Sequence, residues 1–372
     1  MRAIHRNILL TPGPATTTDS VKMSQVVPDI CPREEEFGEV MRYICNELTR
    51  LVADPEHYAT VLFAGSGTAA VESMISSIPG KDAVLIVNNG AYGKRMCEIA
   101  SVYGLNYMEF NSSPEDTIDL VALEKYIRSS TRAISHLAVV HHETTTGLLN
   151  DVNAIGEICK QHAIDLIVDA MSSFGAIPIR MNEMNIAYLA SSSNKNLQGM
   201  AGVSFVIANR SKLDKLKDAQ PRNFYLNLYA QYIHFSKRNQ MRFTPPVQTL
   251  YALKQALDEL KQEGVAKRYK RYTSSWEALI NGIRELGLTH LVPEKHHSKI
   301  ITSIIEPDCA GYHFQTMHDY FYKQGIMIYP GKLDRLNTFR IANIGDITPK
   351  DIALFLALLQ VYLRSIGFVR EK

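Results

Sequence analysis

The alternation of short apolar runs with amphipathic segments is the feature that most limits how this chain can fold. The apolar runs are typical of buried strands, and the segments between them have the apolar spacing of helices. Parallel strands need long crossover connections, which helices supply. The pattern therefore predicts an α/β fold with a mostly parallel sheet covered by helices on both faces. The expected strands are 59–63, 83–87, 137–140, 166–168, 186–190 and 203–207, and the expected helices are 69–77, 94–103, 120–129 and 153–162.

The pattern changes after Thr249, where a long helical stretch at 250–262 leads into a second unit. There we expect a small α+β domain with helices at 267–286, 312–324 and 348–363 and strands at 300–305, 327–329 and 338–342. We therefore divide the chain into an N-terminal segment at residues 1–20, a large cofactor-binding domain at 21–255 and a small C-terminal domain at 256–372.

Charge and composition exclude several classes of partner. The chain has 372 residues with 40 Lys and Arg against 38 Asp and Glu, so no excess of positive charge favours nucleic acid. No apolar run reaches the roughly 20 residues that a membrane helix needs, and prolines interrupt the start before a signal-peptide core can form. The five cysteines form no CxxC pair, which argues against a disulfide framework and a metal site. We expect a cytoplasmic protein with small-molecule partners.

Polar residues gather where the expected strands end, at the edge where open α/β sheets bind ligands. The sequence AGSGTAA places Ser66, Gly67 and Thr68 at the start of a helix, which could hold a phosphate group. The same letters fit a dinucleotide fingerprint, but the acidic residue expected about 20 positions later is missing. A tight turn that merely requires glycine remains open.

Two more strand ends carry side chains that could contact a ligand. Tyr92, in NNGAYG, could stack on a flat ring or simply pack against its own domain. The segment HHETTTG at 141–147 crowds charged and hydroxyl groups together, which suits either a binding site or the capping of a helix.

Asp169 and Lys195 each follow an apolar strand, and both would be costly to bury without a partner. One interpretation is a direct ion pair between them. The other is that both serve pyridoxal phosphate, with Lys195 bonded covalently to its aldehyde and Asp169 facing its ring nitrogen. An anion there would keep the ring protonated and able to accept electrons from the substrate.

Arg340 and Thr244 are candidates for further contacts. Arg340 stands between two apolar residues in FRI, where its guanidinium could take a carboxylate or phosphonate through two hydrogen bonds. A structural ion pair with an acid such as Asp346 is the alternative. The segment MRFTPP offers Arg242 and Thr244 ahead of two prolines.

With these motifs in order, the chain resembles the class V aminotransferases, which are fold-type I enzymes dependent on pyridoxal phosphate. Within that class it is most similar to transaminases that use 2-aminoethylphosphonate and pyruvate. The resemblance covers nearly the whole chain and is carried by LLTPGP (9–14), GSG (65–67), NGAYG (89–93), ETTTG (143–147), VDAMSSFG (168–175), SSNK (192–195), RFT (242–244), IYPGK (328–332) and FRIANIG (339–345).

The resemblance implies roles for single residues. Lys195 and Asp169 would be the catalytic pair that contacts the cofactor. The resemblance further implies a homodimer, in which Thr244 reaches the neighbouring subunit's phosphate site, and a substrate-binding role for Arg340. The implied cofactor-binding residues are Ser66, Gly67 and Thr68 at the phosphate, Tyr92 on the ring face, Thr144 at the ring hydroxyl, and Asp169, Lys195 and Thr244.

The activity that the resemblance implies is transfer of the amino group of 2-aminoethylphosphonate to pyruvate, giving phosphonoacetaldehyde and alanine by a ping-pong reaction. An alanine or serine:glyoxylate transaminase is the alternative among related enzymes. A dinucleotide-dependent oxidoreductase and a protein that binds the cofactor without turnover are the alternatives outside that group.

Overall fold

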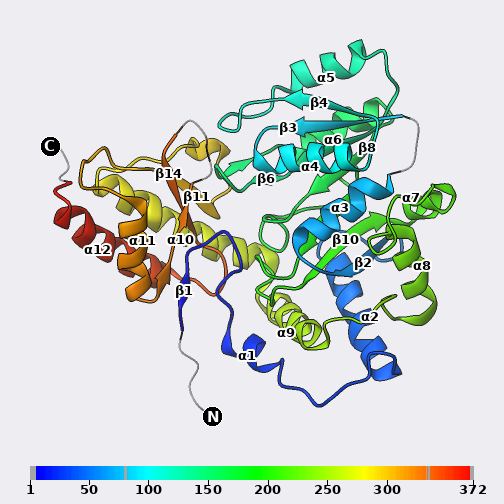
Figure 1. Cartoon of the computed structure of the whole chain (residues 1–372), viewed down its shortest axis with the longest axis horizontal. Coiled ribbons are helices and arrows are strands. Elements are labelled where there is room, and N and C mark those ends of the chain that lie inside the picture. Colours follow the sequence, from blue (N-terminus) through cyan, green and yellow to red (C-terminus); the bar gives the residue numbers. More distant parts are fainter. Residues whose placement is uncertain (1–5, 79–81, 332, 334–335, 369–372) are drawn as a thin grey trace.

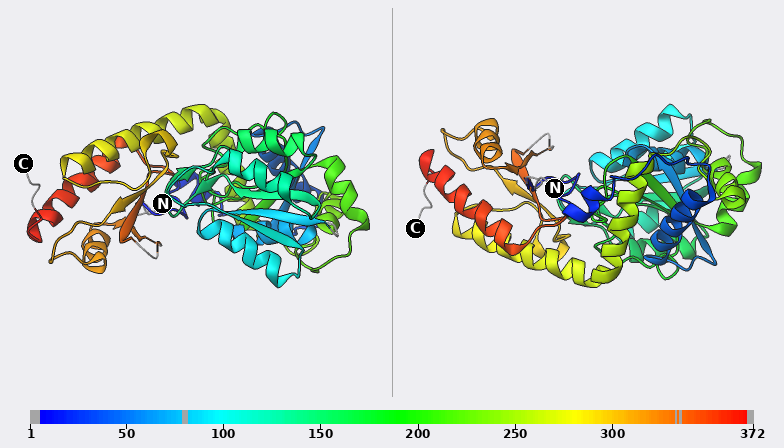
Figure 2. Two further views of the ribbon diagram at one scale, coloured as in Figure 1. Left: turned by 90° about the horizontal axis from the view of Figure 1, so that it is seen from above. Right: turned by 90° about the horizontal axis from the view of Figure 1, so that it is seen from below.

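The computed structural model describes residues 6–78, 82–331, 333 and 336–368 (Figure 1). Lys332 of the IYPGK motif and both extreme ends of the chain lie outside these residues. Two parts are visible: a large one built around a long sheet, and a smaller one near the C-terminus (Figures 1 and 2). Within the described residues, none of the helices is long and apolar enough to cross a bilayer.

The large part contains a seven-stranded sheet in the order β2-β10-β9-β8-β5-β3-β4. Only β10 runs antiparallel to its neighbours, so the expected mostly parallel sheet is confirmed. Six of its strands were expected from sequence, and the edge strand β4 was not. Their bounds are β2 Tyr58–Ala64, β3 Ala83–Asn88, β4 Tyr107–Asn111, β5 Ile134–Val140, β8 Asp165–Asp169, β9 Ile186–Ser192 and β10 Val203–Asn209.

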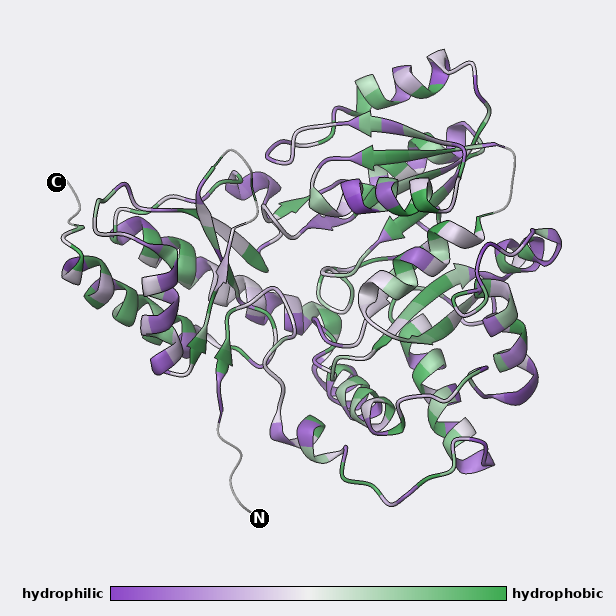
Figure 3. Ribbon diagram, in the orientation of Figure 1, coloured by the Kyte–Doolittle hydropathy of each residue, from purple (hydrophilic) through white to green (hydrophobic). Residues whose placement is uncertain are grey.

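Helices cover both faces of this sheet because successive strand side chains point to opposite sides. Leu85 and Leu137 pack on the side of α2, α5, α6 and α9, whereas Ile86 and Ala138 pack on the side of α3, α4 and α8. Each fully buried Leu or Ile contributes roughly 1.5–3 kcal/mol. The central strands of the sheet are accordingly mostly green, the colour of hydrophobic residues, in Figure 3. The bounds are α2 Glu35–Arg50, α3 Gly67–Ser77, α4 Ala91–Val102, α5 Leu120–Ser129, α6 Val152–Gln161, α8 Leu228–Arg238 and α9 Val247–Glu263.

The smaller part has an antiparallel sheet in the order β11-β14-β13, packed against three helices. The expected domain boundary at 255/256 falls inside α9, and α10 follows directly after Gly264. The bounds are β11 Ile301–Ile305, β13 Tyr329–Pro330, β14 Thr338–Ala342, α10 Val265–Glu285, α11 Phe314–Lys323 and α12 Pro349–Ser365.

One expected strand is wrong in detail. Residues 327–329 do not form a single strand but belong to two sheets: β12 Ile326–Met327 pairs in parallel with β1 Ile8–Leu9, while β13 pairs with β14. The N-terminal segment supplies the unforeseen partner, since Ile8 and Leu10 join the same apolar cluster as Ile326. Residues 8–10 therefore belong to the smaller part, and the chain then crosses toward the larger one.

Candidate active site

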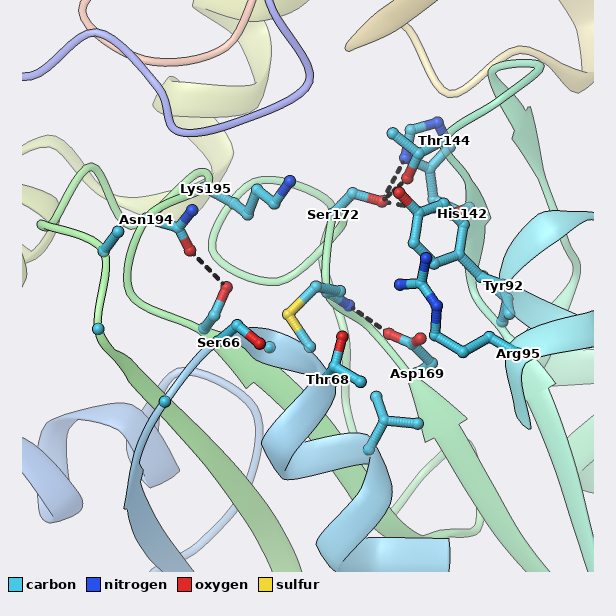
Figure 4. A pocket seen from close by; sticks show the side chains of 18 residues that line it. Ser66, Thr68, Tyr92, Arg95, His142, Thr144, Asp169, Ser172, Asn194 and Lys195 are labelled. Carbon is cyan, nitrogen blue, oxygen red and sulfur yellow. Dashed lines mark hydrogen bonds between the residues drawn. The ribbon is translucent and has the colours of Figure 1, made fainter. Parts of the chain in front are cut away.

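A cavity of about 510 Å³ opens where β2, β5, β8 and β9 end at their carboxyl termini. This volume suits a small organic ligand. Most of the candidate residues from the sequence lie in its wall (Figure 4). The lining consists of Gly65, Ser66, Gly67, Thr68, Val71, Tyr92, Arg95, Val140, His142, Thr144, Asp169, Met171, Ser172, Ser192, Asn194, Lys195, Ala201 and Gly202.

The start of α3 forms one wall of the cavity. Ser66 precedes the helix, and its hydroxyl makes no capping bond to the helix backbone. The first N–H groups of a helix lack partners within it and carry partial positive charge. A Cβ atom on Gly67 would clash with the Met171 sulfur, so the Met171 side chain would have to move to admit any larger residue. This wall can hold an anion such as a phosphate group.

The dinucleotide alternative for this segment does not fit the topology. A dinucleotide fold joins its glycine-rich turn to a neighbouring parallel strand through the helix. Here β2 is an edge strand beside β10, and the next strand along the chain, β3, lies between β5 and β4. The glycine-rich turn therefore opens onto the cavity, but it lacks the adjacent pair of parallel strands that binds a dinucleotide.

Asp169 ends β8 and is buried against the cavity. Its carboxylate accepts a hydrogen bond from the Met171 backbone N–H at 2.9 Å. Burial raises the pKa of Asp169 to about 6, and this backbone bond together with Arg95 and Lys195 limits the rise. A buried carboxylate facing a cavity is suited to pairing with a cationic ligand atom.

Lys195 follows β9 and reaches the cavity from the opposite side (Figure 4). Burial lowers its pKa to about 8, the cation of Arg340 adds to this effect, and Asp169 opposes it. Its ammonium donates a hydrogen bond to the carbonyl oxygen of Pro12. Among the described residues Lys195 forms no ion pair with Asp169, so the direct-pair interpretation lacks support.

The N-terminal LLTPGP segment passes directly over this lysine. Gly13 has a φ of +126°, and a Cβ atom there would clash with the Lys195 side chain. The Ala15 N–H also donates to the Asn194 carbonyl at 3.0 Å. The sequence did not place residues 12–15. In the structure they contact Lys195 and the neighbouring Asn194, and so they restrict where the lysine side chain can lie.

Tyr92 lies in the first turn of α4 and not on the loop that we expected before residue 94. The buried carboxylate of Glu143 accepts the Tyr92 backbone N–H at 3.4 Å, which stabilises an earlier helix start. Both alternatives for the HHETTTG segment therefore hold: Glu143 contacts the start of α4, and His142 and Thr144 line the cavity. The Arg95 guanidinium carbon lies 4.8 Å from the centre of the Tyr92 ring.

Thr144 and His142 are joined through Ser172. The Ser172 hydroxyl lies 2.9 Å from the Thr144 hydroxyl and 2.9 Å from His142 Nδ1 (Figure 4). All three side chains are buried and line the cavity. They form a fixed polar wall next to Tyr92.

Arg340 is 1% exposed in β14 and lies behind Thr144. Its Nε donates to the Pro330 carbonyl at 3.0 Å, and its Nη1 lies 3.5 Å from the Thr144 carbonyl. Burial lowers its pKa. Within the described part of the chain it forms no ion pair, and Asp346 instead accepts a bond from Arg6 through its main chain. The guanidinium thus retains donors for an anionic ligand.

Two candidates are not among the residues that line the cavity: Arg340, which contacts the lining residue Thr144, and Thr244. Thr244 is exposed, beside Arg242, whose guanidinium carbon lies 5.2 Å and 5.0 Å from the ring centres of Phe224 and Phe243. Phe224 is 75% exposed. These residues form an apolar and cationic surface away from the cavity of their own chain.

Several lining residues were missed from sequence. Arg95 stands three positions after Tyr92, a spacing that places both on one helix face and could have identified it. Met171 and Ser172 lie two and three positions after Asp169 in DAMSS. His142 belongs to the HHETTTG segment that the sequence singled out, but its own role stayed open, because a histidine after an apolar strand is equally compatible with a buried structural role.

Comparisons with known proteins show the family of this chain. The sequence model of the aminotransferase class V family matches residues 23–333. The 2-aminoethylphosphonate–pyruvate transaminase of Klebsiella pneumoniae subsp. pneumoniae is 40% identical over 356 residues, which are 95% of this chain and 96% of that protein. The enzyme of the same name from Aeromonas hydrophila subsp. hydrophila is 41% identical over 359 residues, covering 95% and 94%.

Solved structures confirm the fold. A ureidoglycine–glyoxylate aminotransferase from Bacillus subtilis superimposes with a TM-score of 0.90 at 22% identity, covering 99% of this chain and 96% of its own. An alanine–glyoxylate aminotransferase from Nostoc sp. gives 0.90 at 24% identity, covering 97% and 96%.

Proposed function

Since this chain belongs to the class V aminotransferase family, we propose that it transfers the amino group of 2-aminoethylphosphonate to pyruvate, giving phosphonoacetaldehyde and alanine. The observation that carries the chemistry is that Lys195 and Asp169 face one cavity from opposite sides without pairing with each other. The choice of substrates is supported by the relatives of that name, which are similar over almost the entire chain.

We propose pyridoxal phosphate as the cofactor. The cavity offers a partner for its phosphate group and another for its ring nitrogen. The start of α3 with Ser66 and Thr68 suits the phosphate, and Asp169 suits a protonated ring nitrogen. Tyr92 offers a ring for stacking, and Thr144 a hydroxyl. When bound, pyridoxal phosphate supplies an aldehyde that links to amines and a ring that accepts the electron pair released at the substrate carbon.

Lys195 has the properties of a nucleophile and a proton carrier. With a pKa of about 8, roughly a tenth of its amines are neutral at pH 7, whereas an ordinary lysine is almost fully protonated. The neutral amine can bond to an aldehyde and can later take a proton from carbon. Asp169 contributes by remaining an anion above pH 6, where it holds a proton on the ring nitrogen.

Arg340 is proposed to bind the acidic group of either substrate. It is buried, and the described residues provide no carboxylate to pair with it. A carboxylate or phosphonate would complete its hydrogen bonds through the planar fork. One cationic site can serve both half-reactions because the amino donor and the acceptor occupy the cavity in turn.

We further propose that the protein acts as a homodimer in which Thr244 completes the partner's phosphate site. Support comes from the exposed position of Thr244 and from the aromatic surface next to it. The test is to mix inactive Lys195→Ala and Thr244→Val variants under conditions that exchange subunits. A mixed dimer contains one site with both residues intact, so activity should return; no recovery despite exchange would contradict the shared site.

The substrates are tested by measuring alanine formation from pyruvate with 2-aminoethylphosphonate as the donor. Parallel reactions use serine or alanine with glyoxylate, which the alternative enzymes would use. We expect kcat/KM for the phosphonate to exceed the other pairs by at least about a hundredfold, as expected when buried polar groups match one substrate. Faster reaction with glyoxylate would overturn the proposed substrates while leaving the cofactor assignment in place.

A further inference from the structure

His142 is buried beside the proposed cofactor site, but the proposed reaction gives it no role. It is 1% exposed, and its Nδ1 lies 2.9 Å from the Ser172 hydroxyl. Its other ring nitrogen, Nε2, is buried with no hydrogen-bond partner among the described residues. A half-satisfied histidine in the wall of a cavity calls for a physical explanation.

The unpartnered nitrogen indicates which tautomer is present. A hydrogen on Nε2 would leave a buried N–H group without an acceptor, and orphaned buried N–H groups are rare. With the hydrogen on Nδ1, Nδ1 donates to the Ser172 hydroxyl, and Nε2 is left only with a lone pair that accepts no hydrogen bond. Burial keeps the pKa of His142 well below its ordinary value, and the nearby His297, His141 and Lys195 act in the same direction. The ring is therefore neutral with a single hydrogen.

In this tautomer His142 Nδ1 cannot accept the proton of Ser172, which must go to another acceptor. The Ser172 hydroxyl has two possible acceptors: the Thr144 hydroxyl at 2.9 Å and the His142 carbonyl at 3.2 Å. The shorter contact favours donation to Thr144. The hydroxyl of Thr144 then cannot also donate to Ser172, and its own proton is free to point into the cavity that Thr144 lines.

We propose that His142 is a positioning residue which, through Ser172, turns the Thr144 hydroxyl toward the cavity as a hydrogen-bond donor. The inference rests on the proposed function, because the acceptor is the ring oxygen of bound pyridoxal phosphate. Without the donor at His142, Thr144 can donate to Ser172 instead, and only its lone pairs would face that oxygen. The hydrogen bond favours the more negative, deprotonated form of the bound chromophore.

The test is the pH at which the visible absorbance of the cofactor-loaded protein changes. Loss of a hydrogen bond to a charged group should raise this midpoint by about one pH unit. We expect that rise for His142→Phe and for Thr144→Val. Ser172→Ala removes the competing acceptor of the Thr144 proton, so its midpoint should stay near that of wild type. The double variant His142→Phe with Thr144→Val should show no further rise, because both changes remove the same bond.

His142→Asn is the matched control. The asparagine amide nitrogen can occupy the place of Nδ1 and donate to Ser172, so its midpoint should stay within about 0.3 units of wild type. A residue with only a packing role would not show this rescue. If His142→Phe fails to fold, His142→Leu removes the same donor with a smaller side chain that adds no polar group.

The possible outcomes separate this inference from the proposed function. A midpoint unchanged in His142→Phe, with a rise in Thr144→Val, would overturn the role of His142 alone. A wild-type protein that binds pyridoxal phosphate without showing any visible band would overturn both proposals. A protein with the band but no alanine formation from 2-aminoethylphosphonate would overturn the substrates only, and the titration would still decide the role of His142.

Discussion

The substitution Asp169→Asn should stabilise the cofactor-free protein while it disables the reaction. Burial raises the pKa of Asp169 from 3.8 to about 6, so the ionised carboxylate is less favourable in the folded chain than in the unfolded one. This difference corresponds to about 3 kcal/mol of destabilisation at pH 7.5. Asparagine removes that charge, and its side-chain oxygen can still accept the Met171 N–H.

The sign of the pH dependence follows from the raised pKa. The destabilisation is absent below about pH 3, where the carboxyl group is protonated in both states, grows as pH rises past 3.8, and is complete above about pH 7. The gain from Asp169→Asn should therefore be about 3 kcal/mol at pH 7.5 and about 1 kcal/mol at pH 4.5. The assay is urea unfolding of both cofactor-free proteins at the two pH values.

The same variant should lose at least about a hundredfold in kcat with the cofactor bound, because a neutral amide cannot hold a proton on the ring nitrogen. Asp169→Glu is the control that keeps the charge. The reasoning is refuted if Asp169→Asn is less stable than wild type at pH 7.5, or if its stability gain is the same at both pH values. An unchanged kcat would separately refute the role of Asp169.

Three further substitutions test other parts of the site. Lys195→Ala should abolish transamination and leave the circular dichroism spectrum unchanged; near-normal turnover would reject the mechanism. Arg340→Lys should raise KM for both substrates about tenfold or more, since a point charge replaces a bidentate fork, and an unaltered KM for pyruvate would remove Arg340 from the site. Gly67→Ala should weaken pyridoxal phosphate binding about tenfold, because the added methyl group clashes with Met171 and overpacking costs about 1–3 kcal/mol. Fluorescence titration measures this affinity, and an affinity equal to wild type would contradict the close approach of residue 67 to Met171.

Much of the large sheet could be predicted from sequence because its central strands are buried on both faces. Runs such as those in β3 and β5 are therefore almost continuously apolar. The edge strand β4, with the sequence YMEFN, is only partly buried and mixes polar with apolar residues, so it gave no such signal. The helix α2 was also missed, although Phe37, Met41 and Leu48 recur at helical spacing along one buried face.

The site could be predicted only as far as its residues follow strands. Asp169, Tyr92 and the start of α3 come directly after apolar runs, so the sheet brings them to one edge. Contacts between distant segments gave no signal in the sequence. The carbonyl of Pro12 above Lys195 depends on how the N-terminal segment crosses between the two parts of the chain.

The sequence also did not predict the hydrogen-bond partners within the site. Neither the approach of His142 to Ser172 nor the position of Arg340 behind Thr144 can be read from local pattern. Arg340 lies in β14 of the smaller part, 196 positions away from Thr144. Its placement depends on how the two parts pack together and not on the residues around it.

The most direct test of the whole account is the absorbance spectrum of the purified protein during titration with 2-aminoethylphosphonate. The account predicts a visible band from pyridoxal phosphate held by Lys195, which falls as the donor is added and returns when pyruvate follows, with one alanine released per site. A colourless protein that gains no such band with added pyridoxal phosphate, or a band that does not respond to the donor, would contradict it.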